Sequence, residues 1–222
     1  LMSEIKDFVH LQLHTEYSII DSTVSLAPLF EKVVEDKMSC VAITDVMNIY
    51  CTVKAYQKAR AKGIKLIIGA ELWVINPKIN KKIPEKITIL CENLSGYKNL
   101  IEIISDAYIN GVRVDGIPTV DYTKLNTKNC DGLIALIGGK DTLLNQAILS
   151  EDSKKIKLIL DNWQDIFNSK EKDSQDNLFL VVQNFKDEKY ENNNSDQILY
   201  NSVKLAIDNN LPVVATCAVR FI

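Results

Sequence analysis

Two hydrophobic patterns alternate along the chain: short, nearly continuous apolar runs, and longer runs in which apolar positions recur every three or four residues. The first pattern predicts β-strands and the second predicts amphipathic helices. Strands are expected at residues 8–13, 40–44, 66–74, 87–91, 133–137, 178–182 and 213–216. Helices are expected around residues 26–34, 53–60, 100–108, 156–163 and 198–207, and the polar, Asn-rich residues 168–177 and 187–195 predict exposed loops.

The predicted strands are almost continuously apolar, which is typical of parallel strands covered on both faces. Their alternation with helices indicates either a β/α barrel or an open doubly wound sheet, and periodicity does not choose between the two. In both architectures the functional edge lies at the C-terminal ends of the strands. His14, Asp45, Glu71 and Cys217 lie at or near such ends.

Several polar residues are expected to have local structural roles. Ser25 is the predicted N-cap of the first helix, and Asp45 and Asn48 are expected to cap the loop and helix after the second strand. Residues 138–140 (Gly-Gly-Lys) lack the spacing of a phosphate-binding loop and predict a strand-to-helix turn. The basic residues 78–86 predict a short, exposed connection.

Composition and charge limit the function classes. The chain has 222 residues, of which 46% are hydrophobic and 25% charged, as in an ordinary globular protein. A formal charge of −3 argues against a free-standing nucleic-acid-binding protein. The five cysteines are widely spaced and form no CxxC pair, so we expect reduced thiols and a cytoplasmic protein. No apolar run approaches the length of a membrane span, so no membrane partner is expected.

Both histidines of the chain lie near its beginning. A strand-like run carries His14 at its end, and Asp21 follows after a short loop. This is how a barrel enzyme would begin a metal site, because imidazole and carboxylate together bind zinc, manganese or iron. The rest of the chain offers too few further ligands to complete such a site.

Several stretches resemble one known family in order and spacing. They are residues 10–21 (HLQLHTEYSIID), 42–50 (AITDVMNIY), 63–71 (GIKLIIGAE) and 211–221 (LPVVATCAVRF), supported by residues 93–100 (NLSGYKNL) and 131–136 (DGLIAL). Together they resemble the polymerase-and-histidinol-phosphatase (PHP) domain of the bacterial DNA polymerase III alpha subunit. The resemblance covers the whole chain, so residues 1–222 are expected to be one PHP domain. Leu1 before Met2 and the abrupt end at Ile222 suggest an N-terminal fragment of a longer polymerase.

The resemblance implies an α/β fold, a distorted seven-stranded β/α (TIM-like) barrel. In active members of the family, a cluster of His, Asp and Glu side chains holds up to three metal ions for phosphoester hydrolysis. Adjacent divalent ions clamp the phosphate, lower the pKa of a bound water and stabilise the departing oxygen.

This chain departs from the family's ligand pattern at most positions. Only His14, Asp21 and Glu71 match ligands, and they imply no metal or one weakly held ion. The substituted ligand positions are Gln12, Val46, Lys86, Ala218 and Arg220, and Asn184 and Phe185 stand where a further ligand is expected. Lys86 and Arg220 add positive charge that repels cations. We expect Arg220 to pair with Glu71 or Asp21 in place of a metal ion, and His10, which is no ligand position, to be structural.

The leading hypothesis is a structural module within a DNA-directed DNA polymerase. The resemblance implies a degraded PHP site that stabilises the polymerase and docks the proofreading exonuclease. The polymerase carboxylates and their Mg²⁺ lie outside this fragment, which is expected to have no catalytic residue, no cofactor and no enzymatic activity of its own. The expected partners are the other polymerase domains in cis, the exonuclease and further replisome components, with DNA reached through the parent protein.

Two enzymatic alternatives remain open. One is a metal-dependent phosphoesterase, either a pyrophosphatase or a 3′–5′ exonuclease, that works with Zn²⁺ or Mn²⁺ on a reduced ligand set. The lost ligands argue against it. The other is a free-standing enzyme of the histidinol-phosphatase type, which the polymerase-like residues 14–18 and 96–100 disfavour.

Overall fold

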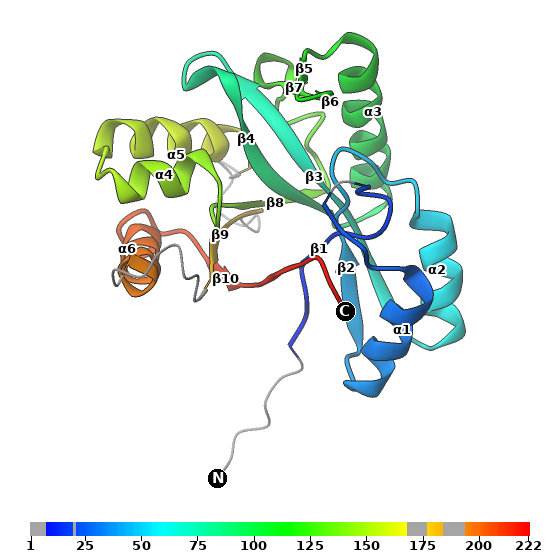
Figure 1. Ribbon diagram of the computed structural model, residues 1–222. Coiled ribbons are helices and arrows are strands. Elements are labelled where there is room, and N and C mark those ends of the chain that lie inside the picture. Colours follow the sequence, from blue (N-terminus) through cyan, green and yellow to red (C-terminus); the bar gives the residue numbers. More distant parts are fainter. Residues whose placement is uncertain (1–7, 20, 168–176, 184–193) are drawn as a thin grey trace. The chain divides into compact units, whose positions relative to one another are not determined.

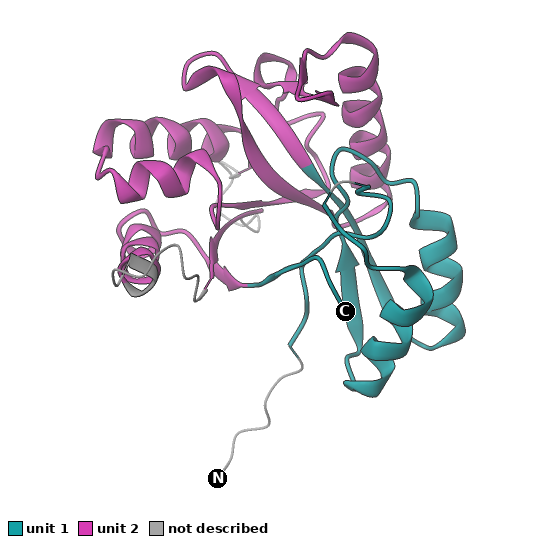
Figure 2. Ribbon diagram, viewed as in Figure 1, with its two compact units in different colours: residues 1–71, 216–222 teal, residues 72–215 magenta. Residues whose placement is uncertain are grey.

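The computed structural model of the chain describes residues 8–19, 21–167, 177–183 and 194–222 (Figure 1). The chain divides into two compact units (Figure 2). Unit 1 combines Leu1–Glu71 with Thr216–Ile222, and unit 2 is the continuous segment Leu72–Ala215. Unit 1 is therefore built from both ends of the sequence.

Unit 1 contains parallel strand pairs with two helices. Its elements are β1 (Gln12–Leu13), α1 (Leu26–Glu35), β2 (Cys40–Ile43), α2 (Thr52–Ala61), the first part of β3 (Lys65–Asn76) and β11 (Ala218–Val219). Strand β2 pairs in parallel with β3, with Val41 opposite Leu66. Strand β1 pairs in parallel with β11, with Gln12 opposite Ala218 and Leu13 opposite Val219.

Helix α1 is amphipathic, and its apolar side contributes four of the eleven residues that form the core of unit 1. The core consists of Leu13, Val24, Leu26, Leu29, Phe30, Val33, Val41, Ile43, Cys51, Ala55 and Ala59. Ser25 occupies the predicted N-cap position of α1, but its hydroxyl makes no capping bond and instead donates to the Glu16 carboxylate at 2.7 Å. Helix α2 buries only small side chains, Ala55 and Ala59.

Unit 2 contains the rest of the strands. Its elements are the end of β3, β4 (Asn80–Cys91), α3 (Leu94–Asn110), β5 (Arg113–Val114), β6 (Ile117–Pro118), β7 (Val120–Asp121), the 3-10 turn Tyr122–Lys124, β8 (Leu133–Ile137), α4 (Leu143–Leu149), α5 (Ser153–Phe167), β9 (Leu178–Val182), α6 (Asn194–Asp208) and β10 (Val213–Ala215). The strand order is β10-β9-β8-β4-β3, with β7 beside β3. Strand β9 pairs in parallel with both of its neighbours, β8 and β10.

Strand β4 corrects two predictions. It runs antiparallel to β8, with Ile89 opposite Ala135, so the sheet is mixed and not fully parallel. It also begins at Asn80, seven residues before the predicted start at residue 87. The predicted exposed connection at residues 78–86 is therefore mostly strand, and only residues 77–79 form the turn from β3. A three-residue turn can join only antiparallel neighbours, whereas parallel strands need a longer crossover.

A close backbone approach explains two of the motifs that carry the family resemblance. Asn93 caps α3, and its side-chain oxygen accepts the Gly96 N–H at 3.0 Å. A Cβ atom on Gly96 would lie 1.8 Å from the carbonyl oxygen of Gly132, so only glycine fits there. Asn99 donates to the Asp131 carbonyl at 2.8 Å and fixes the same contact.

All seven predicted strands and five predicted helices are present in the described parts of the chain, and most of them, though not β8 and β9, have shifted ends. The seven-residue helix α4 and the short strands β5, β6, β7 and β11 were not predicted. The predicted loops at 168–177 and 187–195 lie largely outside the described residues, as do Asn184 and Phe185. Asn194 already belongs to α6, so the second loop ends earlier than predicted.

Candidate functional site

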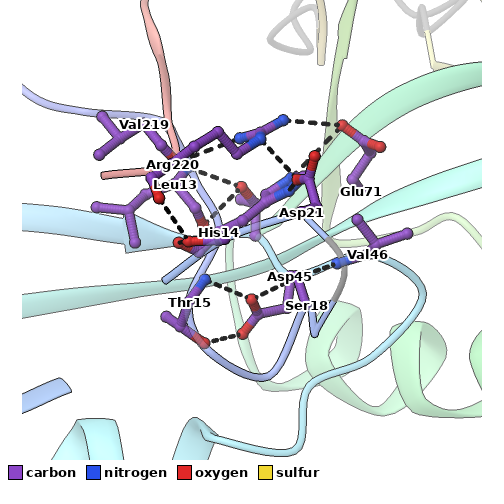
Figure 3. A network of polar contacts seen from close by, with 12 residues as sticks. Leu13, His14, Thr15, Ser18, Asp21, Asp45, Val46, Glu71, Val219 and Arg220 are labelled. Atoms are coloured by element: carbon purple, nitrogen blue, oxygen red, sulfur yellow. Dashed lines mark hydrogen bonds and ion pairs between the residues drawn. The ribbon is translucent and has the colours of Figure 1, made fainter. Parts of the chain in front are cut away.

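His14 lies at the end of β1, at the centre of a polar cluster in unit 1 (Figure 3). Its backbone N–H donates to the Val219 carbonyl at 3.1 Å, which places it beside β11. Its buried ring lies between two carboxylates. Nδ1 is hydrogen-bonded to Asp21, and Nε2 lies 3.5 Å from Glu71 Oε2. The three residues that match family ligands are thus brought together by the fold.

Arg220 completes this cluster from the C-terminal side of β11. Its Nε lies 2.6 Å from Asp21 Oδ2, and one terminal nitrogen lies 3.9 Å from Glu71 Oε2. The expected ion pair of Arg220 is confirmed, and it involves both carboxylates. The backbone of Arg220 is also hydrogen-bonded to the loop after β1. Its carbonyl accepts from the Ser22 hydroxyl at 3.0 Å and from the Thr23 N–H at 3.3 Å.

The ionisation of His14 follows from these contacts. Burial, the largest effect, lowers the pKa of His14, and the nearby Arg220 charge lowers it too. The hydrogen bonds to Asp21 and Glu71 and the charge of Glu71 outweigh both, so the pKa is raised above its ordinary value. A protonated His14 and Arg220 together balance the charges of Asp21 and Glu71.

The side chains of the cluster bond to one another. Within the ranges that the structure describes, no group of three or more His, Cys, Asp or Glu side chains is placed to hold a metal ion. Both ring nitrogens of His14 face carboxylates, and the guanidinium of Arg220 bonds to those same carboxylates. The cationic group beside Asp21 and Glu71 in this arrangement is the guanidinium of Arg220.

Of the five positions predicted to be substituted ligands, Arg220 belongs to this cluster and three others lie beside it along the chain or in strand pairing. Gln12 and Ala218 are paired residues of β1 and β11, and each lies two residues before its cluster member, His14 and Arg220 respectively. Val46 forms an isolated parallel bridge with Glu71. The fifth position, Lys86, belongs to β4 in unit 2, where its ammonium group lies 4.9 Å from the centre of the Trp73 ring.

Asp45 has a different role from the predicted one. Its carboxylate accepts from the Thr15 N–H at 2.6 Å, the Thr15 hydroxyl at 2.7 Å and the Ser18 hydroxyl at 2.7 Å. It therefore fixes the loop after β1, and it also accepts from the thiol of Cys51, the residue before α2, at 3.5 Å. The Ser18 oxygen in turn accepts the Val46 N–H at 3.0 Å. Sequence reasoning missed Thr15 and Ser18, because no local pattern signals partners some thirty positions away.

Asn48 caps its own loop as predicted, since its side-chain oxygen accepts the Tyr50 N–H at 3.2 Å. All five cysteines are free thiols, and burial beside Asp45 raises the pKa of Cys51 to about 12. His10 packs edge-on against Phe8, with 4.9 Å between ring centres, and burial lowers its pKa.

Comparison with known proteins gives the class of this fold. A family model described as "PHP domain" matches residues 10–174, so the chain belongs to the PHP domain family. The α/β fold class implied by the sequence resemblance is confirmed. The fold also resembles a putative metal-dependent phosphoesterase from Bifidobacterium adolescentis, with a TM-score of 0.57 and 10% identity over 96% of this chain and 86% of that one. An amidohydrolase from Chromobacterium violaceum gives a TM-score of 0.59 and 11% identity, with coverage of 96% and 87%.

The particular relatives are polymerase subunits. The chain is 34% identical over 215 residues to the DNA polymerase III subunit alpha of Pseudomonas fluorescens, covering 97% of this chain and 17% of that protein. It is 34% identical over 222 residues to the subunit of the same name from Escherichia coli K12, covering 100% and 18%. The chain thus spans less than a fifth of the length of these relatives. In the described parts of the chain, no helix is both long enough and apolar enough to cross a membrane.

Proposed function

We propose that this chain is the N-terminal PHP domain of a replicative DNA polymerase III alpha subunit, and that its former metal centre is now a structural ion-pair cluster. One observation carries this proposal: Arg220 contacts both Asp21 and Glu71, the two carboxylates that match metal ligands. A divalent ion would have to displace a guanidinium that already neutralises them. The substitutions at Gln12, Val46 and Ala218 remove further donors from the same place.

Loss of metal chemistry leaves a role in assembly. We propose that the domain supports the remaining polymerase domains in cis and docks a separate proofreading exonuclease in the cytoplasm. The relatives support the first part, because they are named as polymerase subunits and are more than five times longer than this chain. DNA synthesis and its Mg²⁺ ions would belong to those other domains, since the described residues hold no comparable carboxylate group.

Metal stoichiometry tests the proposal. The purified chain is dialysed against zinc and against manganese, and the bound metal is measured by elemental analysis. We expect well below one equivalent of either metal. A matched variant that restores donors, Gln12→His with Val46→His and Arg220→His, is expected to bind more metal than the natural chain.

The opposing hypothesis is a metal-dependent phosphoesterase, for which the proximity of His14, Asp21 and Glu71 is the favouring observation. One tightly held equivalent of metal, lost in His14→Ala, would support it. Manganese-dependent hydrolysis of a phosphodiester that disappears in Glu71→Ala would then establish the activity and refute the structural role. Docking is tested separately, by titrating the chain with the exonuclease subunit in a calorimeter, where no heat of binding would refute that part.

A further inference from the structure

Helix α2 and the loops beside it form an unusual part of the unit 1 surface. Residues 46–70 contain no Asp or Glu, although the whole chain has a net charge of −3. Within this segment the basic residues are Lys54, Lys58, Arg60, Lys62 and Lys65. A continuous stretch of one charge sign on an otherwise acidic protein indicates a surface for a polyanion.

Exposed aromatic and aliphatic side chains accompany these cations. Tyr50 is 64% exposed, Tyr56 is 52% exposed and the aliphatic Val53 is 67% exposed. The reason lies in the packing of α2, which buries only Ala55 and Ala59. The long side chains of this helix therefore face outward.

A third tyrosine is held beside the start of α2. Asn48 bridges two loops, because its amide nitrogen donates to the Tyr17 carbonyl at 3.2 Å and its oxygen accepts the Tyr50 N–H at 3.2 Å. Lys54 then joins the helix to the first loop. Its ammonium group donates to the Tyr17 hydroxyl at 2.9 Å and lies 5.6 Å from the centre of that ring. The basic–aromatic surface consists of Tyr17, Tyr50, Tyr56, Lys54, Lys58, Arg60 and Lys62.

Three of the basic side chains of this surface form no salt bridge in the described parts of the chain. Within the described ranges, Lys58, Arg60 and Lys62 have no salt bridge to a carboxylate. On the adjacent helix α1, by contrast, Lys32 pairs with Glu35 at 3.2 Å and with Asp36 at 2.9 Å. The charge of α2 is thus available to an external anion.

We propose that the basic–aromatic surface binds single-stranded nucleic acid. Lysine and arginine side chains neutralise phosphates and release counterions, which gives affinity independent of sequence. Exposed tyrosines can stack on unpaired bases, whereas the bases of a duplex are already stacked on each other. A favourable interaction of Lys58 and Arg60 with the C-terminal dipole of α2 explains cations in the last turn. It does not explain the exposed Tyr50 just before the helix or the exposed Tyr56 within it. This inference goes beyond the proposed function and involves none of the His14 cluster.

Fluorescence anisotropy with a labelled oligothymidine of about 20 nucleotides, longer than a typical binding site, tests the proposal. The full 222-residue chain is used. Lys58→Glu with Arg60→Glu is expected to weaken binding by about tenfold or more and to flatten the salt dependence. The matched control is Lys128→Glu with Lys204→Glu, which changes the net charge equally at exposed positions of unit 2. This control is expected to change the affinity less than about twofold.

Further measurements distinguish single-stranded nucleic acid from other anionic ligands. Tyr50→Ala with Tyr56→Ala is expected to weaken binding by about tenfold while leaving the salt dependence unchanged, since stacking contributes no charge. Equal losses of affinity in Lys58→Glu with Arg60→Glu and in its control, Lys128→Glu with Lys204→Glu, would overturn the proposal. So would equal affinity for a duplex of the same length, or binding to anionic lipid vesicles with none to the oligonucleotide. Circular dichroism of each variant confirms folding. Failure here would leave the metal measurement on the His14 cluster unaffected.

Discussion

Arg220 and Asp21 lie almost 200 positions apart in the sequence, yet Arg220 Nε is 2.6 Å from Asp21 Oδ2. The contact ties the last residues of the chain to the loop that follows β1. Because Arg220 also reaches Glu71, one side chain connects three segments of unit 1. Its removal should therefore affect folding more than an ordinary surface substitution.

We expect Arg220→Met to lower the free energy of unfolding by about 1–3 kcal/mol, because two carboxylates lose their cationic partner. The Asp21 side chain is 44% exposed, so solvent screens the ion pair between Arg220 and Asp21. The contribution of this pair is therefore expected in the lower half of the range. Urea denaturation measures the change. Arg113→Met is the control, since Arg113 donates to the Gly116 carbonyl at an exposed site, and it should cost less than about 0.5 kcal/mol. Equal effects of the two variants would contradict a central role for Arg220.

His14 should make the stability depend on pH near neutrality. Its pKa is raised in the folded chain, so protonated His14 stabilises the fold. This contribution is fully present below the unfolded value of about 6.5 and is lost as the pH rises through the higher folded pKa. The midpoint of urea unfolding should fall across this window. The decline should be shallower in His14→Gln, and an unchanged slope would mean that the His14 contacts do not control its ionisation.

Glu85 should produce a second pH effect in unit 2. Burial raises its pKa to about 7, although its carboxylate accepts the Leu143 N–H at 2.8 Å. The protonated form is the one that folding favours. The contribution of Glu85 to the free energy of unfolding is therefore fully present below about pH 4.5 and is lost as the pH rises to about 7.

Glu85→Gln keeps an acceptor for the Leu143 N–H without the charge. At pH 8 it should be more stable than the natural chain by up to about 3 kcal/mol, and at pH 4 it should show no such gain. Thermal unfolding at the two pH values makes the comparison. Glu102→Gln, at an exposed position of α3, serves as the control and should show no difference. A gain of the same size at both pH values would argue against ionisation as the cause.

Gly96→Ala should be severely destabilising, because its Cβ would lie 1.8 Å from the Gly132 carbonyl oxygen. Both partners are backbone, so neither can rotate away, and a loss of about 3 kcal/mol or more is expected. Ser95→Ala, at the exposed neighbouring position, should cost less than about 0.5 kcal/mol. A well-folded Gly96→Ala chain would show that α3 can move away from residue 132.

The sequence predicted elements best where burial on both faces made the apolar run continuous. Strands β8 and β9 match the predicted ranges residue for residue. The prediction from sequence failed for the first half of β4, where Lys81 and Lys82 are exposed and give no strand pattern. The antiparallel direction of β4 was also missed, because direction depends on the length of the turn and not on hydrophobicity.

The candidate site was predictable in part for a similar reason. His14 directly follows β1, in agreement with the rule that functional residues gather at strand ends. Glu71, by contrast, lies inside β3 and not at its C-terminal end. The family pattern added Asp21 and marked Arg220 as a replacement. The hydrogen bonds of Asp45 to Thr15 and Ser18 could not be predicted, because they depend on how two loops meet in space and leave no periodic trace.

The pairing of β1 with β11 has a consequence for biosynthesis. Unit 2 is one continuous segment, and all its residues have been made once Ala215 is added. Unit 1 is complete only after Val219 and Arg220 have been added, long after the synthesis of its first strand. At about 5–20 residues per second, the strand at Gln12 remains without its partner for at least about ten seconds. Nascent chains that have passed residue 215 but not residue 220 are therefore where we would look for chaperone capture.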